Sequence, residues 1–250
     1  MDLPSSINIA LLIDADNAQP KLLKQIIEEV SKYGKATIRR IYGDWTNTSL
    51  NSWKTSLNDF SFNPIQKFSY TTGKNSTDSS LIIDAMDILH SQKVGGFCIV
   101  SSDSDYTGLA KRIREEGIFV MGIGEKKTPM AFVQSCEIFT YCENIALEIT
   151  APVTSIKDKR RKKSKSPVPV VPPFASLIDK AFDITVNEDT ETHISKVGIT
   201  IRKIDPAFDP RAFGFKNLTQ LFENLPNYTV IKNQVGGFNH PLVRRNPPSS

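Results

Sequence analysis

The chain has 250 residues and a formal net charge of +4, with 39% hydrophobic and 23% charged residues. This composition excludes an intrinsically disordered chain, and the length fits one or two domains. No stretch approaches the ~20 apolar residues of a membrane span, the N-terminal residues lack the pattern of a signal peptide, and three cysteines without a CxxC pair are too few for a disulfide framework. We therefore expect a cytoplasmic protein with no membrane partner.

In the first 150 residues, short apolar runs alternate with helical patterns. The runs at 8–14, 36–43, 60–70, 96–102, 118–124 and 138–142 predict strands, and the patterns at 20–34, 48–57, 78–90, 107–117 and 129–136 predict helices. Gly34 is expected to cap the first of these helices at its C-terminus. Strands that alternate with helices favour right-handed crossovers and a mainly parallel sheet with flanking helices. Residues 1–150 are therefore predicted to form a domain of the α/β class.

Residues 151–173 form a predicted linker that is first basic and then rich in proline. Within it, the segment KDKRRKKSK at 157–165 has seven basic residues and one acid, whereas residues 1–150 carry a net charge of −3 and residues 166–250 a net charge of +1. Its like charges and prolines favour an extended, solvated chain. The segment is either only a spacer or also an RNA-binding element. The candidate phosphate contacts are Lys159, Arg160, Arg161, Lys162 and Lys163.

Residues 174–250 have a different pattern. Helical patterns at 174–182, 193–204 and 218–225 are followed by strand-like runs at 228–232 and 240–245, which flank a turn-rich loop suited to a hairpin. Three helices and a terminal hairpin in so short a segment predict a small winged helix-turn-helix domain.

Four aspartates follow predicted strands of the first domain. Asp14 and Asp16 close the strand in LLIDADN, and Asp103 and Asp105 close the strand in FCIVSSDSD. Asp78 lies on the apolar side of a predicted helix and therefore points toward the same sheet. Because ligands of parallel α/β sheets bind at the carboxyl ends of the strands, these acids are candidates for one site.

Carboxylates that converge at one edge repel one another, and each has a raised pKa. A hard divalent cation such as Mg²⁺ or Mn²⁺ removes that cost and can stabilise displacement at a phosphodiester. Each aspartate taken singly can instead be an N-cap of the following helix. The occurrence of Asp14, Asp78 and Asp103 together at compatible positions favours the cation site.

The stretches LLIDADNA, GKNSTDSSLIIDAMDIL, FCIVSSDSDYTGLAKRIREEG and GIGEKKTP, in this order within residues 7–145, resemble the NYN domain of the LabA-like, PIN-like nuclease family. The resemblance implies a PIN-like fold and a ribonuclease-like site that uses Mg²⁺ or Mn²⁺. By motif position, the implied catalytic and metal-binding residues are Asp14, Asp78, Asp103 and Asp105. The implied supporting or substrate-contacting residues are Asp16, Asn17, Lys74, Asn75, Asp84, Ser101 and Ser102.

The stretch DPAFDPRAFGFKNLTQLF, within a match over residues 174–235, is similar to an OST-HTH/LOTUS domain. The resemblance implies contacts with RNA or with a protein partner. Arg211 and Lys216 are the candidate RNA contacts, with Lys196, Arg202 and Lys203 as an additional basic helix face or as ordinary solvated charges. Phe213 and Phe215 are expected to be core residues rather than platforms for base stacking.

Together these features predict a metal-dependent ribonuclease, residues 1–150, joined by a linker to an RNA-binding domain, residues 174–250. Single-stranded or structured RNA is the expected substrate, and a homodimer is expected because PIN-like folds often pair. One alternative is a catalytically silent adaptor that binds RNA or protein. The other is a phosphatase of the haloacid-dehalogenase type, because Asp14 and Asp16 have the spacing of its nucleophile and acid.

Overall fold

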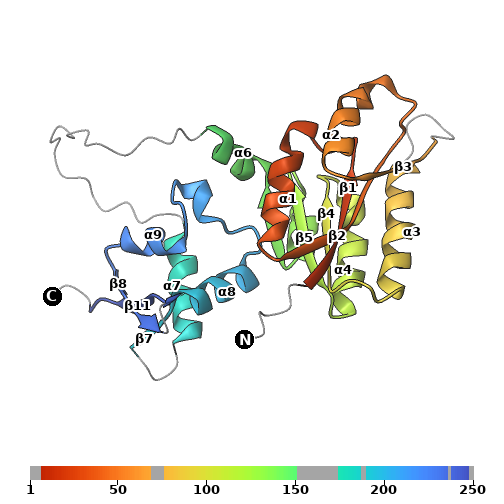
Figure 1. The fold of residues 1–250 in the computed structure, drawn as a ribbon. Coiled ribbons are helices and arrows are strands. Elements are labelled where there is room, and N and C mark those ends of the chain that lie inside the picture. The colour runs from red at the N-terminus through yellow and green to blue at the C-terminus, as the bar shows by residue number, and fades with distance from the viewer. Residues whose placement is uncertain (1–6, 69–75, 151–173, 187–189, 236–237, 248–250) are drawn as a thin grey trace. The chain divides into compact units, whose positions relative to one another are not determined.

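The computed structural model describes residues 7–68, 76–150, 174–186, 190–235 and 238–247. The chain divides into two compact units, Met1–Ile149 and Thr150–Ser250 (Figure 1). The predicted linker at 151–173, with its basic residues Lys159 to Lys163, lies outside the described residues. In the part of the chain that the structure describes, no helix combines the length and apolar character needed to cross a membrane.

The first unit contains a six-stranded sheet in which every neighbouring pair is parallel. The strand order is β3-β2-β1-β4-β5-β6. The strands are β1 (Ile7–Asp14), β2 (Gly34–Gly43), β3 (Asn63–Gln66), β4 (Gly96–Val100), β5 (Phe119–Gly124) and β6 (Ile138–Tyr141). The predicted α/β class with a mainly parallel sheet is confirmed.

Helices cover both faces of this sheet, and the central strands are therefore buried on both sides. They are α1 (Leu23–Ser31), α2 (Trp53–Asp59), α3 (Ser76–His90), α4 (Thr107–Glu115), α5 (Met130–Ser135) and α6 (Cys142–Thr150), with short 3₁₀ helices η1 (Pro20–Leu22), η2 (Thr48–Ser52) and η3 (Ser104–Tyr106). Alternate residues of β1 such as Leu11 pack with α1 and α2 in one core cluster. The intervening residues, such as Leu12, are equally buried, and α3 packs against β1 and β2.

Two local expectations differ from the structure. Gly34 is not a helix cap: α1 ends at Ser31, and Gly34 is the first residue of β2. A Cβ atom at Gly34 would lie 2.3 Å from the carbonyl oxygen of Ile7, so the close approach of β1 requires glycine there. Helix α6 was not predicted, and it extends the first unit beyond its last strand.

The strand order reverses direction at one point of the sheet. β1 lies between β2 and β4, so the chain proceeds outward in one direction from β1 to β3 and in the other from β4 to β6. Such a reversal leaves a crevice at the carboxyl ends of the two central strands. Asp14 is the last residue of β1, and Ser101 directly follows β4.

The second unit contains three helices and a small antiparallel sheet. The elements are α7 (Ala175–Thr185), β7 (Glu191–His193), α8 (Ile194–Ile204), η4 (Pro210–Phe213), α9 (Leu218–Glu223), β8 (Tyr228–Ile231), β9 (Gln234–Val235), β10 (Phe238–Asn239) and β11 (Leu242–Arg245). Strands pair in the order β7-β11-β8 over a core that includes Val197, Leu221 and Phe222. The predicted helices are confirmed, the predicted hairpin strands correspond to β8 and β11, and β7, β9 and β10 are additional strands.

Candidate active site

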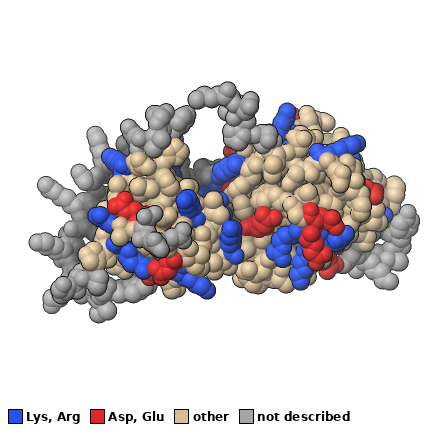
Figure 2. Space-filling view, turned by 90° about the horizontal axis from the view of Figure 1, so that it is seen from below, with Lys and Arg blue, Asp and Glu red and all other residues tan. Residues whose placement is uncertain are grey.

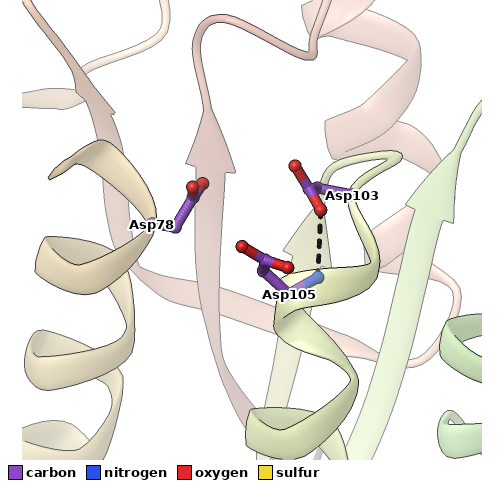
Figure 3. Close-up of side chains that lie close together, drawn as sticks. All are labelled: Asp78, Asp103 and Asp105. Atoms are coloured by element: carbon purple, nitrogen blue, oxygen red, sulfur yellow. Dashed lines mark hydrogen bonds between the residues drawn. The ribbon is translucent and has the colours of Figure 1, made fainter. Parts of the chain in front are cut away.

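Three carboxylates meet at the carboxyl edge of the parallel sheet. Asp78 lies in the first turn of α3, Asp103 follows β4, and Asp105 lies in η3. One carboxylate oxygen from each lies within 4.8 Å of the other two. Figure 3 shows the Asp78 side chain pointing from α3 toward the other two. We call these three residues the acidic triad.

The loop after β4 is folded by its own polar side chains. Asp103 is the N-cap of η3, and its Oδ1 accepts a hydrogen bond from the backbone N–H of Asp105 at 3.0 Å (Figure 3). The backbone N–H of Asp103 donates to Oγ of Ser101 at 3.1 Å. Asp103 is therefore both an N-cap and a triad member, because the cap occupies only one of its two carboxylate oxygens.

Asp14 lies beside the triad but is not part of it. Its side chain is only 1% exposed. Oδ1 accepts from the backbone N–H of Asp16 at 3.1 Å, and Oδ2 accepts from Nδ2 of Asn17 at 2.7 Å and Oγ of Ser101 at 3.0 Å. This buried carboxylate is thus satisfied by protein donors.

Tyr106 connects Asp14 to the triad, and it was not among the site residues expected from the sequence. The side chain is fully buried, and its hydroxyl donates to Oδ1 of Asp78 at 2.7 Å and lies 3.4 Å from Oδ2 of Asp14. A signal was present in the sequence: Tyr106, Leu109 and Ile113 have the spacing of one buried helix face. The hydroxyl on an otherwise apolar face needs a polar partner, which the carboxylates supply.

The electrostatics of the site disfavour negative charge. Burial raises the pKa of Asp78, the hydrogen bond from the Tyr106 hydroxyl lowers it, and the neighbouring carboxylates of Asp14, Asp103 and Asp105 raise it further. Burial likewise raises the pKa of Asp14, against the lowering effect of its hydrogen bonds. A bound cation would reverse this balance by stabilising the ionised form.

The donor set of the triad fits a hard divalent cation. Three carboxylates offer oxygen ligands, which Mg²⁺ and Mn²⁺ prefer, and leave positions for water or phosphate oxygens. Exposure increases from Asp78, which is buried, to Asp105, which is exposed, so solvent reaches the cluster from the side of Asp105. Among the described residues, this is the one group of three or more acidic, histidine or cysteine side chains close enough to share an ion.

The loop after β5 lies beside the loop after β4, which carries Asp103. Ser102 accepts from the backbone N–H of Glu125 at 2.9 Å, and Glu125 accepts from Gln19 at 3.2 Å and pairs with Lys127 at 2.8 Å. A Cβ atom at Gly124 would lie 2.5 Å from the carbonyl oxygen of Ser101. The two loops therefore lie so close together that only glycine fits at position 124.

The other residues that the sequence predicted to support the site do not lie together. Asp16 is exposed, and Asn17 contacts Asp14 as described. Asp84 is not with the triad, because it is bound by Arg40 and the hydroxyl of Tyr42 on the side of α3 that faces β2. Lys74 and Asn75 lie outside the described residues.

In the second unit, Arg211 is held by its own turn. Its guanidinium pairs with Asp209 at 2.7 Å, its side chain is 16% exposed, and Asp209 caps η4. An RNA contact from Arg211 stays a prediction, as does one from the exposed Lys216. Phe215 packs against the core as expected, whereas Phe213 is 39% exposed although its ring lies 4.5 Å from that of Phe174.

The face in Figure 2 shows Lys and Arg side chains interspersed with Asp and Glu.

Comparison with known proteins identifies both units. The NYN domain family model matches residues 8–147, and the OST-HTH/LOTUS domain model matches residues 174–240. No curated protein matches the sequence. A crystal structure of a protein of unknown function, VPA0982 from Vibrio parahaemolyticus, is similar with a TM-score of 0.49 and 17% sequence identity, over 58% of this chain and 98% of that one.

Proposed function

Because the chain belongs to the NYN domain family and also contains an OST-HTH/LOTUS domain, as its sequence predicted, we propose that it is a ribonuclease that depends on a divalent cation and hydrolyses RNA phosphodiester bonds. The two domains support an RNA-related role as a nuclease or as a binder. The acidic triad at the carboxyl edge of the sheet is the observation that carries the more specific proposal.

In this proposal, Asp78, Asp103 and Asp105 hold Mg²⁺ or Mn²⁺. When bound, the cation supplies positive charge that stabilises the negative charge developing on a phosphodiester during displacement. Asp105, as the exposed member, faces the approaching RNA. Ser101 orders the site, since its hydroxyl donates to Asp14 and accepts from the Asp103 backbone.

We assign recognition of the substrate to the remaining segments. The basic residues Lys159 to Lys163 attract phosphates, and the OST-HTH/LOTUS domain, residues 174–250, holds RNA or a protein partner. Single-stranded RNA is the expected substrate, because a backbone must enter a cleft at the strand ends without a paired helix blocking it. The homodimer and a cytoplasmic location stay predictions.

One observation favours a catalytically silent adaptor as the second candidate. Asp14, which the family resemblance implies as a ligand, is 1% exposed and already satisfied by protein donors. A site with three available carboxylates can bind a cation without turning over substrate at a useful rate. The same observation disfavours a phosphatase, since a buried Asp14 is poorly placed to attack a phosphomonoester.

The test is cleavage of a labelled single-stranded RNA in Mn²⁺ and in EDTA, with RNA binding measured in the same samples. Asp103→Asn removes one triad charge while asparagine still caps η3, so the fold of the loop is retained. Asp87→Asn, an exposed position on the same helix as Asp78, is the control for charge alone.

We expect wild type and Asp87→Asn to cleave in Mn²⁺ only, and Asp103→Asn to bind RNA without cleaving it. Binding by all three proteins with no cleavage in any metal would instead support the adaptor. Hydrolysis of a small phosphomonoester with RNA left intact would support the phosphatase.

A further inference from the structure

The hydroxyl of Tyr106 lies between two carboxylates with different surroundings. It is 2.7 Å from Oδ1 of Asp78 and 3.4 Å from Oδ2 of Asp14. A phenol has one proton to donate, and the shorter distance assigns that proton to Asp78. The buried ring of Tyr106 also packs against Phe132, with a centroid separation of 6.3 Å. The position of the hydroxyl is therefore set by the core.

The two carboxylates differ in how many other donors they have. Asp14 is held by the Asp16 backbone, Asn17 and Ser101 without any help from Tyr106. The carboxylate of Asp78, in contrast, accepts one hydrogen bond from the described residues, and its donor is the Tyr106 hydroxyl. Removing the hydroxyl would therefore change the hydrogen bonding of the Asp78 carboxylate much more than that of Asp14.

We propose that Tyr106 is a positioning residue of the cation site: its hydroxyl orients Asp78 toward Asp103 and Asp105 and separates it from Asp14. This inference rests on the metal site of the proposed function.

The physical basis is the usual role of hydrogen bonds to metal ligands. A carboxylate on a helix can rotate about its side-chain torsions, and a fixed donor on one oxygen removes that freedom before the cation binds. Loss of such a partner typically weakens metal affinity by roughly tenfold to a hundredfold. Without the hydroxyl, Asp78 and Asp14 would also face each other with no donor between them.

Calorimetric titration of the full chain with Mn²⁺ tests the proposal through affinity, independently of any RNA cleavage. Tyr106→Phe removes only the hydroxyl. Tyr42→Phe is the matched control, because Tyr42 is equally buried and its hydroxyl donates to a different carboxylate, Asp84. Unfolding followed by tryptophan fluorescence verifies that each variant is folded.

We expect wild type to bind Mn²⁺ and Tyr106→Phe to bind it with a Kd raised roughly tenfold to a hundredfold. Tyr42→Phe should lower stability without changing the Kd. A merely structural role for Tyr106 would lower stability and leave the Kd at the wild-type value, which would overturn the proposal while the metal site stands. No Mn²⁺ binding at all would overturn the metal-dependent function together with this inference.

Discussion

Replacing Asp78 by asparagine should stabilise the cation-free protein and destabilise the cation-bound one relative to wild type. Asparagine keeps the size of the side chain and an oxygen that can accept from Tyr106, but it removes one of the three triad charges. Since burial and the neighbouring carboxylates raise the pKa of Asp78, its ionised form is disfavoured by folding. The variant removes that cost.

The size of the effect follows from the separation of the charges. Two unit charges 4.8 Å apart, the limit found for the triad oxygens, repel by about 0.9 kcal/mol in water and by about 3.5 kcal/mol at an effective dielectric constant of 20. Asp105 is exposed and Asp103 half-buried, so solvent screening favours the lower figure for both pairs. The charged hydrogen bond from Tyr106 becomes a neutral one, which offsets part of this gain, and a net stabilisation of about 1 kcal/mol remains.

With the cation bound, wild type should be more stable than Asp78→Asn. At a free concentration of 100 times its Kd, a ligand stabilises the folded state by about 2.7 kcal/mol, and the variant should lose most of this. Urea unfolding in EDTA and in Mn²⁺ measures both effects. Tryptophan fluorescence reports on the first unit alone, because Trp45 and Trp53 are the two tryptophans of the chain. Asp87→Asn should show neither effect.

Two results would contradict these predictions separately. If Asp78→Asn is less stable than wild type in EDTA, repulsion within the triad is outweighed by the weakened hydrogen bond from Tyr106. If Mn²⁺ stabilises the variant as much as wild type, Asp78 is not a cation ligand.

Further predictions concern the pH dependence of the site and the glycines near it. Mn²⁺ affinity should increase as pH rises above the ordinary carboxyl range, because protons held by the raised pKa of Asp78 must leave before the cation binds; a titration that gives the same Kd at pH 5 and pH 7.5 would contradict this. Gly124→Ala should destabilise the first unit by about 1–3 kcal/mol, because its Cβ would collide with the Ser101 carbonyl. Gly108→Ala, where a Cβ meets nothing within 4 Å on helix α4, should instead stabilise it by about 0.5–1 kcal/mol; urea unfolding of both variants distinguishes the two signs.

The sequence was sufficient to predict the α/β class and the strand ends because both depend on local patterns. The run from Ile9 to Ile13 is apolar because β1 is buried on both faces, and Asp14 ends it at the edge of the sheet. The convergence of Asp78 with Asp103 follows from the same topology, since the parallel order brings the end of β4 and the start of α3 to one edge.

Features that depend on contacts between distant segments were not predictable in this way. Asp84 lies only two turns from Asp78 on α3, yet Arg40 and Tyr42 of β2 bind it away from the triad. The distinction between Asp14 and the triad depends on donors from several segments, among them Ser101 and Tyr106. The periodicity of a short segment does not show which distant side chains will contact it. The helix cap expected at Gly34 was wrong because Gly34 begins β2, where the close approach of β1 requires a glycine.

Anomalous diffraction from crystals of the full chain grown with Mn²⁺ would locate the cation that the acidic triad is proposed to bind. We predict manganese within bonding distance of oxygens of Asp78, Asp103 and Asp105. Crystals saturated with Mn²⁺ that show no manganese at the triad would contradict the proposed cation site.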